Sequence, residues 1–317
     1  MDKDLICDFQ NLYKAYQKTK SGKKFNGSCA RFQTMSLEGL HILKEQLENQ
    51  TYSMNPYNKF KIYEPKEREI KSCAFKDKVV QNCLCYTVLR PRLQSQFIRT
   101  NYAGQIDKGT HFGMDCLKEQ MLNFYEEHGT NGWILKCDIR KFFYTIEHDP
   151  VKDIVDYYFY DEYTVWLNHL FIDSVKSPGL PLGNPVALMY ALLMLDGLDH
   201  FVTGELGIDK YGRYSDDFYL ICSSRSYVKW RKEAVEAFVS TLGLSLNGKT
   251  QIVPFRKGIS FLGFHHYVTE DGKYIRKIKG ENKRKIKKKL NSWAKAVKAG
   301  EMMSTEFYTN YNAWKNH

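Results

Sequence analysis

The sequence lacks most of the features that mark secreted, membrane-spanning or fibrous proteins. Its eight cysteines form no Cys-x-x-Cys pair and stand at no metal-ligand spacing from histidine, which excludes a zinc module. There is no repeat, low-complexity tract or Pro/Gly-rich linker. Residues 1–6 carry two acids and no long apolar stretch, so we expect no secretory signal. The longest apolar run, 185–195, is too short to span a bilayer. We therefore expect a cytoplasmic protein with reduced thiols and no membrane contact.

Acidic side chains are also fewer than basic ones. The 317 residues contain 36 Asp and Glu against 47 Lys and Arg, which gives a net charge of +11. Such an excess indicates a polyanionic partner, most often nucleic acid. Hydrophobic residues make up 43% and aromatic residues 15%, so the chain can bury a core and is not a disordered protein. Its length suits two domains, or one enzyme core with an added module.

Periodicity in the first third predicts helices around one hairpin. Leucines at 37, 40, 43 and 47 recur at helical spacing. Residues 60–63 alternate like a strand and lead into a basic, hairpin-like stretch at 64–70. Residues 76–98 have the pattern of a further helix.

The middle third alternates strands with helices. Residues 133–138 read as a buried strand that ends in a carboxylate, and helices are expected at about 148–158 and 162–175. After a Gly/Pro loop, Asn184 and Pro185 suit the N-cap and the first position of an apolar helix that runs towards Val202.

Two strand-like runs then surround an acidic turn, within residues 211–222. A helix follows with Trp230, Ala234, Phe238 and Leu242 on one face, and strands are expected at about 250–254 and 259–268. The order of elements predicts an α+β fold. From residue 271 the chain is strongly basic, and we expect a separate helical module there.

Three carboxylates carry the chemistry. Asp138 ends an apolar strand, and Asp216 and Asp217 occupy the turn of a hairpin. Acids crowded at strand ends repel each other unless a cation neutralises them. Mg²⁺ binds through one or two carboxylates together with substrate phosphates, and two such ions can serve phosphoryl transfer. The alternative is a solvated turn, the ordinary setting of an Asp-Asp pair.

Two motifs carry a family resemblance. Residues 214–217 (Tyr-Ser-Asp-Asp) are similar to the YxDD turn of reverse transcriptases, and residues 138–143 (Asp-Ile-Arg-Lys-Phe-Phe) are similar to their first palm motif. The chain resembles a prokaryotic reverse transcriptase of the diversity-generating retroelement, retron or antiphage defence class. The resemblance implies an RNA-directed DNA polymerase whose Asp138, Ile139 carbonyl, Asp216 and Asp217 hold Mg²⁺ or Mn²⁺.

The resemblance also implies a right-hand fold with an antiparallel-sheet palm. Residues 1–125 would form an N-terminal extension and the fingers, 126–270 the palm with fingers helices inserted at about 148–180, and 271–317 a short, basic, helical thumb.

Further site residues follow from the same resemblance. The residues implied for nucleotide binding are Lys66 and Arg68, which would bind the triphosphate, Phe143, which would act as the steric gate against ribose, and Gly183 and Lys249. The residues implied for primer or template binding are Pro181, Leu182, Asn184, Leu188, Tyr214, Phe261, Leu262, Gly263, Lys283, Arg284, Lys287 and Lys288. Trp293 and Tyr311 are expected to pack the core of the thumb.

The implied partners are a non-coding RNA template, a DNA or RNA primer and dNTPs, with an accessory protein or a second copy of the chain. Ala187 and Leu188 stand where related enzymes carry Ser-Gln or Ser-Pro. This departure keeps two alternatives open. One is an untemplated or protein-primed nucleotidyltransferase with the same site, and the other is a catalytically silent RNA-binding scaffold.

Overall fold

Four apolar strands form the central antiparallel sheet of the protein, in the order β4-β5-β3-β6. The computed structural model describes residues 2–21, 27–63 and 67–315. The strand expected at 133–138 is present, and the acidic turn joins β4 to β5. The strands are β3 (Trp133–Asp138), β4 (Tyr211–Tyr214), β5 (Asp217–Cys222) and β6 (Gln251–Pro254).

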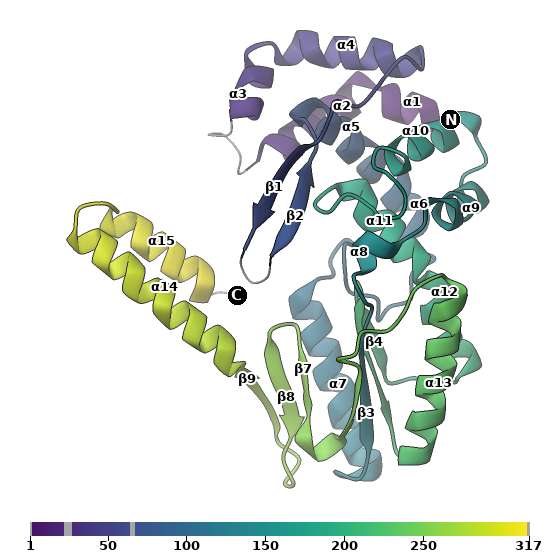
Figure 1. The fold of residues 1–317 in the computed structure, drawn as a ribbon, viewed down its shortest axis with the longest axis vertical. Helices are drawn as coiled ribbons and strands as arrows, with labels where there is room; N and C mark the ends of the chain where they lie inside the picture. Colours follow the sequence, from purple (N-terminus) through teal and green to yellow (C-terminus); the bar gives the residue numbers. More distant parts are fainter. Residues whose placement is uncertain (1, 22–26, 64–66, 316–317) are drawn as a thin grey trace.

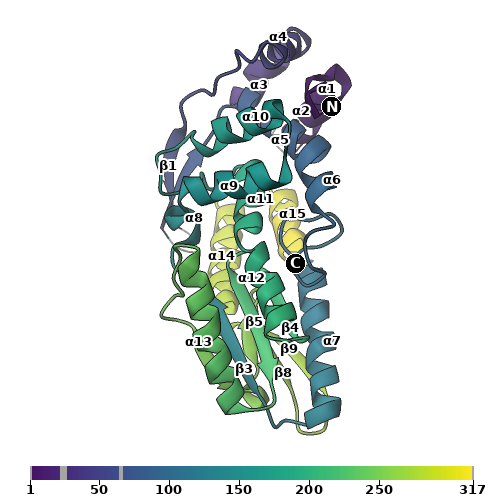
Figure 2. The ribbon, with the colours of Figure 1, turned by 90° about the vertical axis from the view of Figure 1, so that its right-hand side faces the viewer.

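Two long helices cover this sheet. Helix α13 (Arg225–Thr241) packs against β3 and β5, and helix α7 (Thr110–His128) packs against β4 and against strand β8 (Phe264–Val268) of a second sheet. Figure 2 shows the strands between the two helices. The buried face of α13 is formed by Val228, Val235 and Val239, whereas Trp230 is 55% exposed. Trp230, which helical spacing groups with Ala234, Phe238 and Leu242 on one face, thus lies largely in solvent, because the valines occupy the side that meets the strands.

A second antiparallel sheet of three strands follows the central one. It consists of β7 (Ile259–Phe261), β8 (Phe264–Val268) and β9 (Tyr274–Ile278). Strand β9 lies in the basic segment that was expected to be helical. It pairs with β8 along its length, and the Tyr274 hydroxyl lies 2.7 Å from Nδ1 of the buried His266. The basic helical part of the chain therefore begins only after this strand.

The N-terminal half is mostly helical and carries a two-stranded hairpin. Leu40, Leu43 and Leu47 of α4 are buried as the spacing predicts, but Leu37 is exposed. All eight cysteines are free and buried. The elements are α1 (Asp2–Cys7), α2 (Phe9–Lys20), α3 (Gly27–Thr34), α4 (Ser36–Glu48), β1 (Asn58–Ile62), β2 (Arg68–Ser72), α5 (Phe75–Leu84), the π-helical turn η1 (Cys85–Leu89) and α6 (Arg90–Leu93).

A helical layer connects this half to the central sheet. Helix α11 begins at Pro185 with Asn184 as its N-cap residue, as the sequence predicts. The run Pro185–Glu205 is long and apolar enough to cross a membrane by length and composition, yet 72% of its most apolar window is buried inside the protein. It therefore serves as a core helix. The elements here are α8 (Phe142–Thr145), α9 (His148–Tyr158), α10 (Glu162–Ile172), α11 (Pro185–Met194), α12 (Asp196–His200) and the π-helical turn η2 (Phe201–Glu205).

The chain ends in a helical hairpin that extends from the body of the protein (Figure 1). It follows the short 3₁₀ turn η3 (Phe255–Lys257) and the three-stranded sheet, and consists of α14 (Gly280–Lys298) and α15 (Ser304–Lys315). Trp293 lies edge-on to Phe307, with ring centroids 6.4 Å apart, and Phe307 stacks on Tyr311 at 6.5 Å. These rings pack the two helices together, as expected for Trp293 and Tyr311.

Candidate active site

The register of the central sheet brings the three predicted carboxylates to one end. Asp138 pairs directly with Asp217 across β3 and β5. The amide of Ile139 donates to the carbonyl of Asp216 at 3.1 Å. Side chains directly opposite each other in an antiparallel pair lie on the same face of the sheet. The strand end and the hairpin turn therefore meet, although the sequence separates them by 78 residues.

The acidic turn has a strained backbone that is held by one buried arginine. Ser215 has a φ of +59°, in the left-handed region that non-glycine residues seldom adopt. Its carbonyl accepts a hydrogen bond from Nη1 of Arg213 at 3.0 Å. This contact fixes the residue that immediately precedes Asp216.

Arg213 is itself part of a fully buried ion pair. Its Nε donates to Oδ1 of Asp199 at 2.6 Å and its Nη2 donates to Oδ2 at 2.5 Å, and both side chains have no solvent exposure. The Tyr211 hydroxyl donates to the same carboxylate at 2.6 Å. A bidentate pair of this kind satisfies charges that would be costly to bury alone. Helix α12 is thereby connected to the acidic turn.

Asp138 is oriented from the other side by Asn247. The Asn247 side-chain amide donates to Asp138 Oδ2 at 2.8 Å, and its backbone amide donates to the Asp138 carbonyl at 2.6 Å. The residue of this segment named from the sequence was Lys249, which is exposed and donates only its backbone amide to Asn247. Asn247 was missed, and its place two residues before Lys249 in the sequence was the available signal.

Asp217 is engaged differently from the other two carboxylates. Its carboxylate forms an ion pair with the ammonium group of Lys136, which lies two residues before Asp138 on the same strand. Burial lowers the pKa of Lys136 to about 7, against the opposing effect of the acids nearby. The Lys136 ammonium also lies 5.0 Å from the centroid of the Phe261 ring. Lys136 was not predicted, although a lysine within an apolar strand is an unusual residue.

A cavity of about 420 Å³ opens beside these carboxylates. Asp138 and Asp216 both line it, whereas Asp217 does not. A volume of this size is in the range of small-molecule sites. The lining residues are Glu67, Asp138, Ile139, Lys141, Phe142, Phe143, Tyr144, Leu182, Ser215, Asp216 and Asn247.

The carboxylates that line this cavity suit a cation that binds together with a phosphorylated ligand. Within the residues that the structure describes, no three His, Cys, Asp or Glu side chains are grouped closely enough to hold a metal by themselves. Mg²⁺ needs only one or two carboxylates because water and substrate phosphates complete its octahedron. Asp138 and Asp216 meet that requirement, and Ile139 lines the same space. The three carboxylates are therefore not equivalent, since Asp217 is paired with Lys136.

The predicted nucleotide-binding residues are only partly brought together. Phe143 lines the cavity, while Gly183, with a φ of +96°, is exposed in the loop before α11. Arg68 begins β2 opposite Ile62. Lys66 lies outside the described residues.

Several predicted primer or template residues turn out to be structural. Phe261 is fully buried against Tyr102 and Tyr219, so its ring has no surface left for a primer. Pro181 is buried, and Asn184 is 4% exposed because it faces inward. Contact of these three side chains with nucleic acid stays a prediction, and their burial gives it no support.

Asn184 instead ties two parts of the site together. Its Nδ2 donates to the Tyr57 hydroxyl at 3.0 Å and its Oδ1 accepts from Sγ of Cys73 at 3.4 Å. Tyr57 and Cys73 flank the β1–β2 hairpin. The loop before α11 and the base of that hairpin are thus hydrogen-bonded.

The other predicted contacts divide between the cavity, the core and the surface. Leu182 lines the cavity, and half-buried Leu188 packs beside Gly104. Half-buried Tyr214 packs on the core, and the half-buried Leu262 and Gly263 form the end of the β7–β8 hairpin. The cations of α14 are exposed, namely Lys283, Arg284, Lys287 and Lys288.

Comparison with known proteins agrees with this geometry. A family model described as "Reverse transcriptase (RNA-dependent DNA polymerase)" matches residues 58–266, which is more than half of the chain. The chain belongs to this family and is an RNA-directed DNA polymerase by that membership. No curated protein sequence matches it.

Solved structures show the same fold. The chain is similar to apo telomerase from Candida tropicalis, with a TM-score of 0.52, 10% identity and coverage of 74% of this chain and 53% of the telomerase. It is also similar to telomerase from Candida albicans in complex with a fragment of telomeric RNA, with a TM-score of 0.53, 13% identity and coverage of 72% and 46%. The chain thus spans about half the length of these telomerases. The α+β architecture with antiparallel sheets is that of the reverse transcriptase fold.

Proposed function

We propose that this enzyme copies a non-coding RNA into DNA in a bacterial or phage retroelement or antiphage defence system. Its substrates would be dNTPs, its primer DNA or RNA, and its cation Mg²⁺ or Mn²⁺. The observation that carries the proposal is the cavity in which Asp138, Asp216 and Phe143 meet at the end of the central sheet. Family membership supports RNA-directed synthesis, and the cytoplasmic setting and an accessory protein or second copy are part of the same proposal.

Asp138 and Asp216 would hold the cation. When bound, it supplies charge neutralisation for the triphosphate and lowers the pKa of the attacking 3′ hydroxyl. Asn247 keeps the Asp138 carboxylate oriented through its 2.8 Å hydrogen bond, and Arg213 fixes the turn that carries Asp216. Positioning of this kind supplies most of the catalysis in phosphoryl transfer.

Phe143 would select the sugar. It follows Asp138 by five residues, is half-buried and lines the same cavity. A flat ring beside the sugar of the bound nucleotide leaves no room for a ribose 2′ hydroxyl. We expect Phe143→Ala to raise the use of ribonucleotides relative to deoxynucleotides.

The C-terminal hairpin would act as the thumb and hold the nucleic acid. Helix α14 carries exposed lysines and arginines that can neutralise phosphates without reading the sequence. The complex of one structural neighbour with telomeric RNA supports an RNA partner. The domain limits proposed from the sequence, at 125/126 and 270/271, belong to this hypothesis.

The test is dTTP incorporation on poly(rA) primed with oligo(dT), with Mg²⁺ or Mn²⁺ in parallel. Asp138→Asn and Asp216→Asn should each lower the rate by about 10²–10³-fold or more. Asp149→Asn, at an exposed position of α9, should leave it unchanged and is the matched control. Activity that survives in both site variants would contradict the proposal.

Sequencing of products made on the native RNA separates the alternatives. DNA complementary to that RNA supports templated copying. A homopolymer, or DNA that stays attached to the protein, would instead support the untemplated or protein-primed enzyme. Full biological function in Asp138→Ala would support the silent scaffold.

A further inference from the structure

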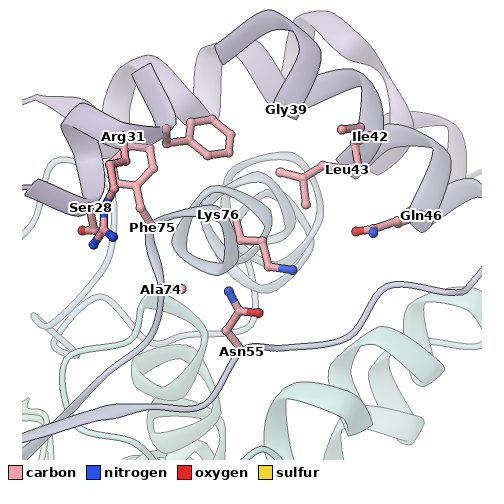
Figure 3. A pocket seen from close by; sticks show the side chains of 11 residues that line it. Ser28, Arg31, Gly39, Ile42, Leu43, Gln46, Asn55, Ala74, Phe75 and Lys76 are labelled. Atoms are coloured by element: carbon pink, nitrogen blue, oxygen red, sulfur yellow. The ribbon is translucent and has the colours of Figure 1, made fainter. Parts of the chain in front are cut away.

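A second cavity, of about 390 Å³, lies in the N-terminal half, and none of its lining residues belongs to the candidate active site. It is formed by helices α3 and α4 together with the chain around Asn55 and the start of α5. Figure 3 shows Lys76 and Asn55 directed into the space beside α4. In Figure 1, α3 and α4 lie at the opposite end of the molecule from α7 and α13.

The chemistry of this pocket combines an aromatic wall with positive charge. The half-buried Phe32 lines it, backed by Phe75, which is only 5% exposed and has its ring centroid 5.3 Å from that of Phe32. Arg31 and Lys76 also line it, and none of the described residues that do so is acidic. Neither cation has a carboxylate partner among the residues that the structure describes. An anionic ligand with a flat apolar part fits this combination.

Two amides add hydrogen-bonding groups at the same place. Gln46 reaches the pocket from α4 and Asn55 from the opposite side. The backbone amide of Asn55 donates to Asp77 Oδ2 at 3.1 Å, which holds this stretch of chain in position. Asn and Gln side chains recognise the edges of nucleobases, which also pack on aromatic rings when they are unpaired. Arginine and lysine bind the phosphate of the same ligand.

We propose that this pocket binds one nucleotide, with its base against the half-buried ring of Phe32 and its phosphate at one of the two flanking cations, Arg31 or Lys76. The nucleotide is either free or an unpaired residue of an RNA. The site is additional to the polymerase site and does not depend on the proposed function, because the two cavities share no lining residue.

The experiment uses the full chain and a single-stranded RNA of 4-thiouridine as a photo-crosslinking probe, with the adducts mapped by mass spectrometry. We expect an adduct within residues 28–46 or 74–76. Arg31→Ala combined with Lys76→Ala should lower its yield about tenfold, since both cations that could hold the phosphate are removed. Lys14→Ala combined with Lys229→Ala removes two exposed cations elsewhere and should leave the yield unchanged.

A second variant tests the apolar wall without altering the charges. Ile42 lines the pocket and is 47% exposed, so Ile42→Trp should cover the mouth and also lower the adduct yield. Competition with excess ATP distinguishes a free nucleotide from an unpaired residue of an RNA as the ligand. Loss of the crosslink indicates a site for free nucleotide, and persistence of the crosslink indicates a site for RNA. An adduct that is absent from these residues, or is unaffected by both variants, would overturn the proposal. Activity on poly(rA) with oligo(dT) reports the polymerase site independently.

Discussion

The end of the central sheet and helix α14 are both rich in charged side chains, but several of those at the sheet are buried and paired whereas those on the helix are exposed. At the sheet, Arg213 and Asp199 are fully buried and paired, and Lys136 is paired with Asp217. On α14 the cations project into solvent. Chemistry at a single atom requires carboxylates fixed by neighbours, whereas phosphate binding without sequence specificity requires only a sufficient density of charge. Substitutions should therefore affect stability at the sheet and salt dependence at the helix.

The largest effect should come from Arg213. Arg213→Met leaves Asp199 buried without its partner and should lower the free energy of unfolding by about 3–5 kcal/mol. Urea denaturation measures this change. Arg99→Met removes a pair that is exposed on both sides and should cost less than about 1 kcal/mol. Equal losses in the two variants would show that the buried pair is no more important than a surface pair.

His266 should give the sheet region a dependence on pH. Burial lowers the pKa of His266 to about 4 from the model-compound value of 6.5. The unfolded chain therefore binds the proton first on acidification, so this contribution to stability is complete above pH 6.5 and is lost as the pH falls towards 4. The loss amounts to about 3 kcal/mol. The measurement is the difference in unfolding free energy between wild type and His266→Gln across this range; a constant difference would contradict the prediction.

Asp217 should prove more important for stability than Asp209, an exposed acid that also pairs with a lysine. Asp217→Asn leaves the buried Lys136 without its paired carboxylate, and we expect a loss of about 1–2 kcal/mol. Asp209→Asn, which removes an 80% exposed partner of Lys210, is the control and should change stability by less than about 1 kcal/mol. Thermal unfolding of both variants provides the comparison. Identical midpoints would mean that the Lys136 pair contributes nothing.

The smallest effect should come from the exposed helix. Lys283→Ala combined with Lys287→Ala should leave stability unchanged but reduce the slope of log affinity against log salt concentration. The reduction should be about 0.7–0.9 for each lysine that contacts a phosphate. Titrations of an RNA–DNA hybrid at several salt concentrations measure it. A slope equal to that of wild type would show that the hybrid does not bind at Lys283 and Lys287.

Local patterns in the sequence predicted the elements that carry the site. An apolar run that ends in Asp138, an acidic turn between two apolar runs, and the Asn184-Pro185 helix start each determine their structure within a few residues. The reverse transcriptase family and the α+β fold followed from the same motifs. The burial of Phe261 and the exposure of Trp230 did not follow, because they depend on which face of an element meets its neighbour.

The pairings between distant side chains could not be predicted either. Lys136 meets Asp217 only because of the register between β3 and β5, and Arg213 meets Asp199 only because α12 packs beside β4. Hydrophobic periodicity identifies a strand or helix but leaves its partners open. The ion pair between Asp217 and Lys136 is therefore a property of the tertiary structure.

The hydrogen bonds at the start of α14 have a mechanical consequence. The Lys279 amide and the Asn282 side chain both donate to the carbonyl of Gly263, at 3.5 and 3.1 Å. The base of the protruding helical hairpin is thus fastened to the tip of the β7–β8 ribbon. A tilt of α14 about its first turn would also displace the tip of the β7–β8 hairpin. A force applied to the helical hairpin would therefore be transmitted to the β7–β8 hairpin.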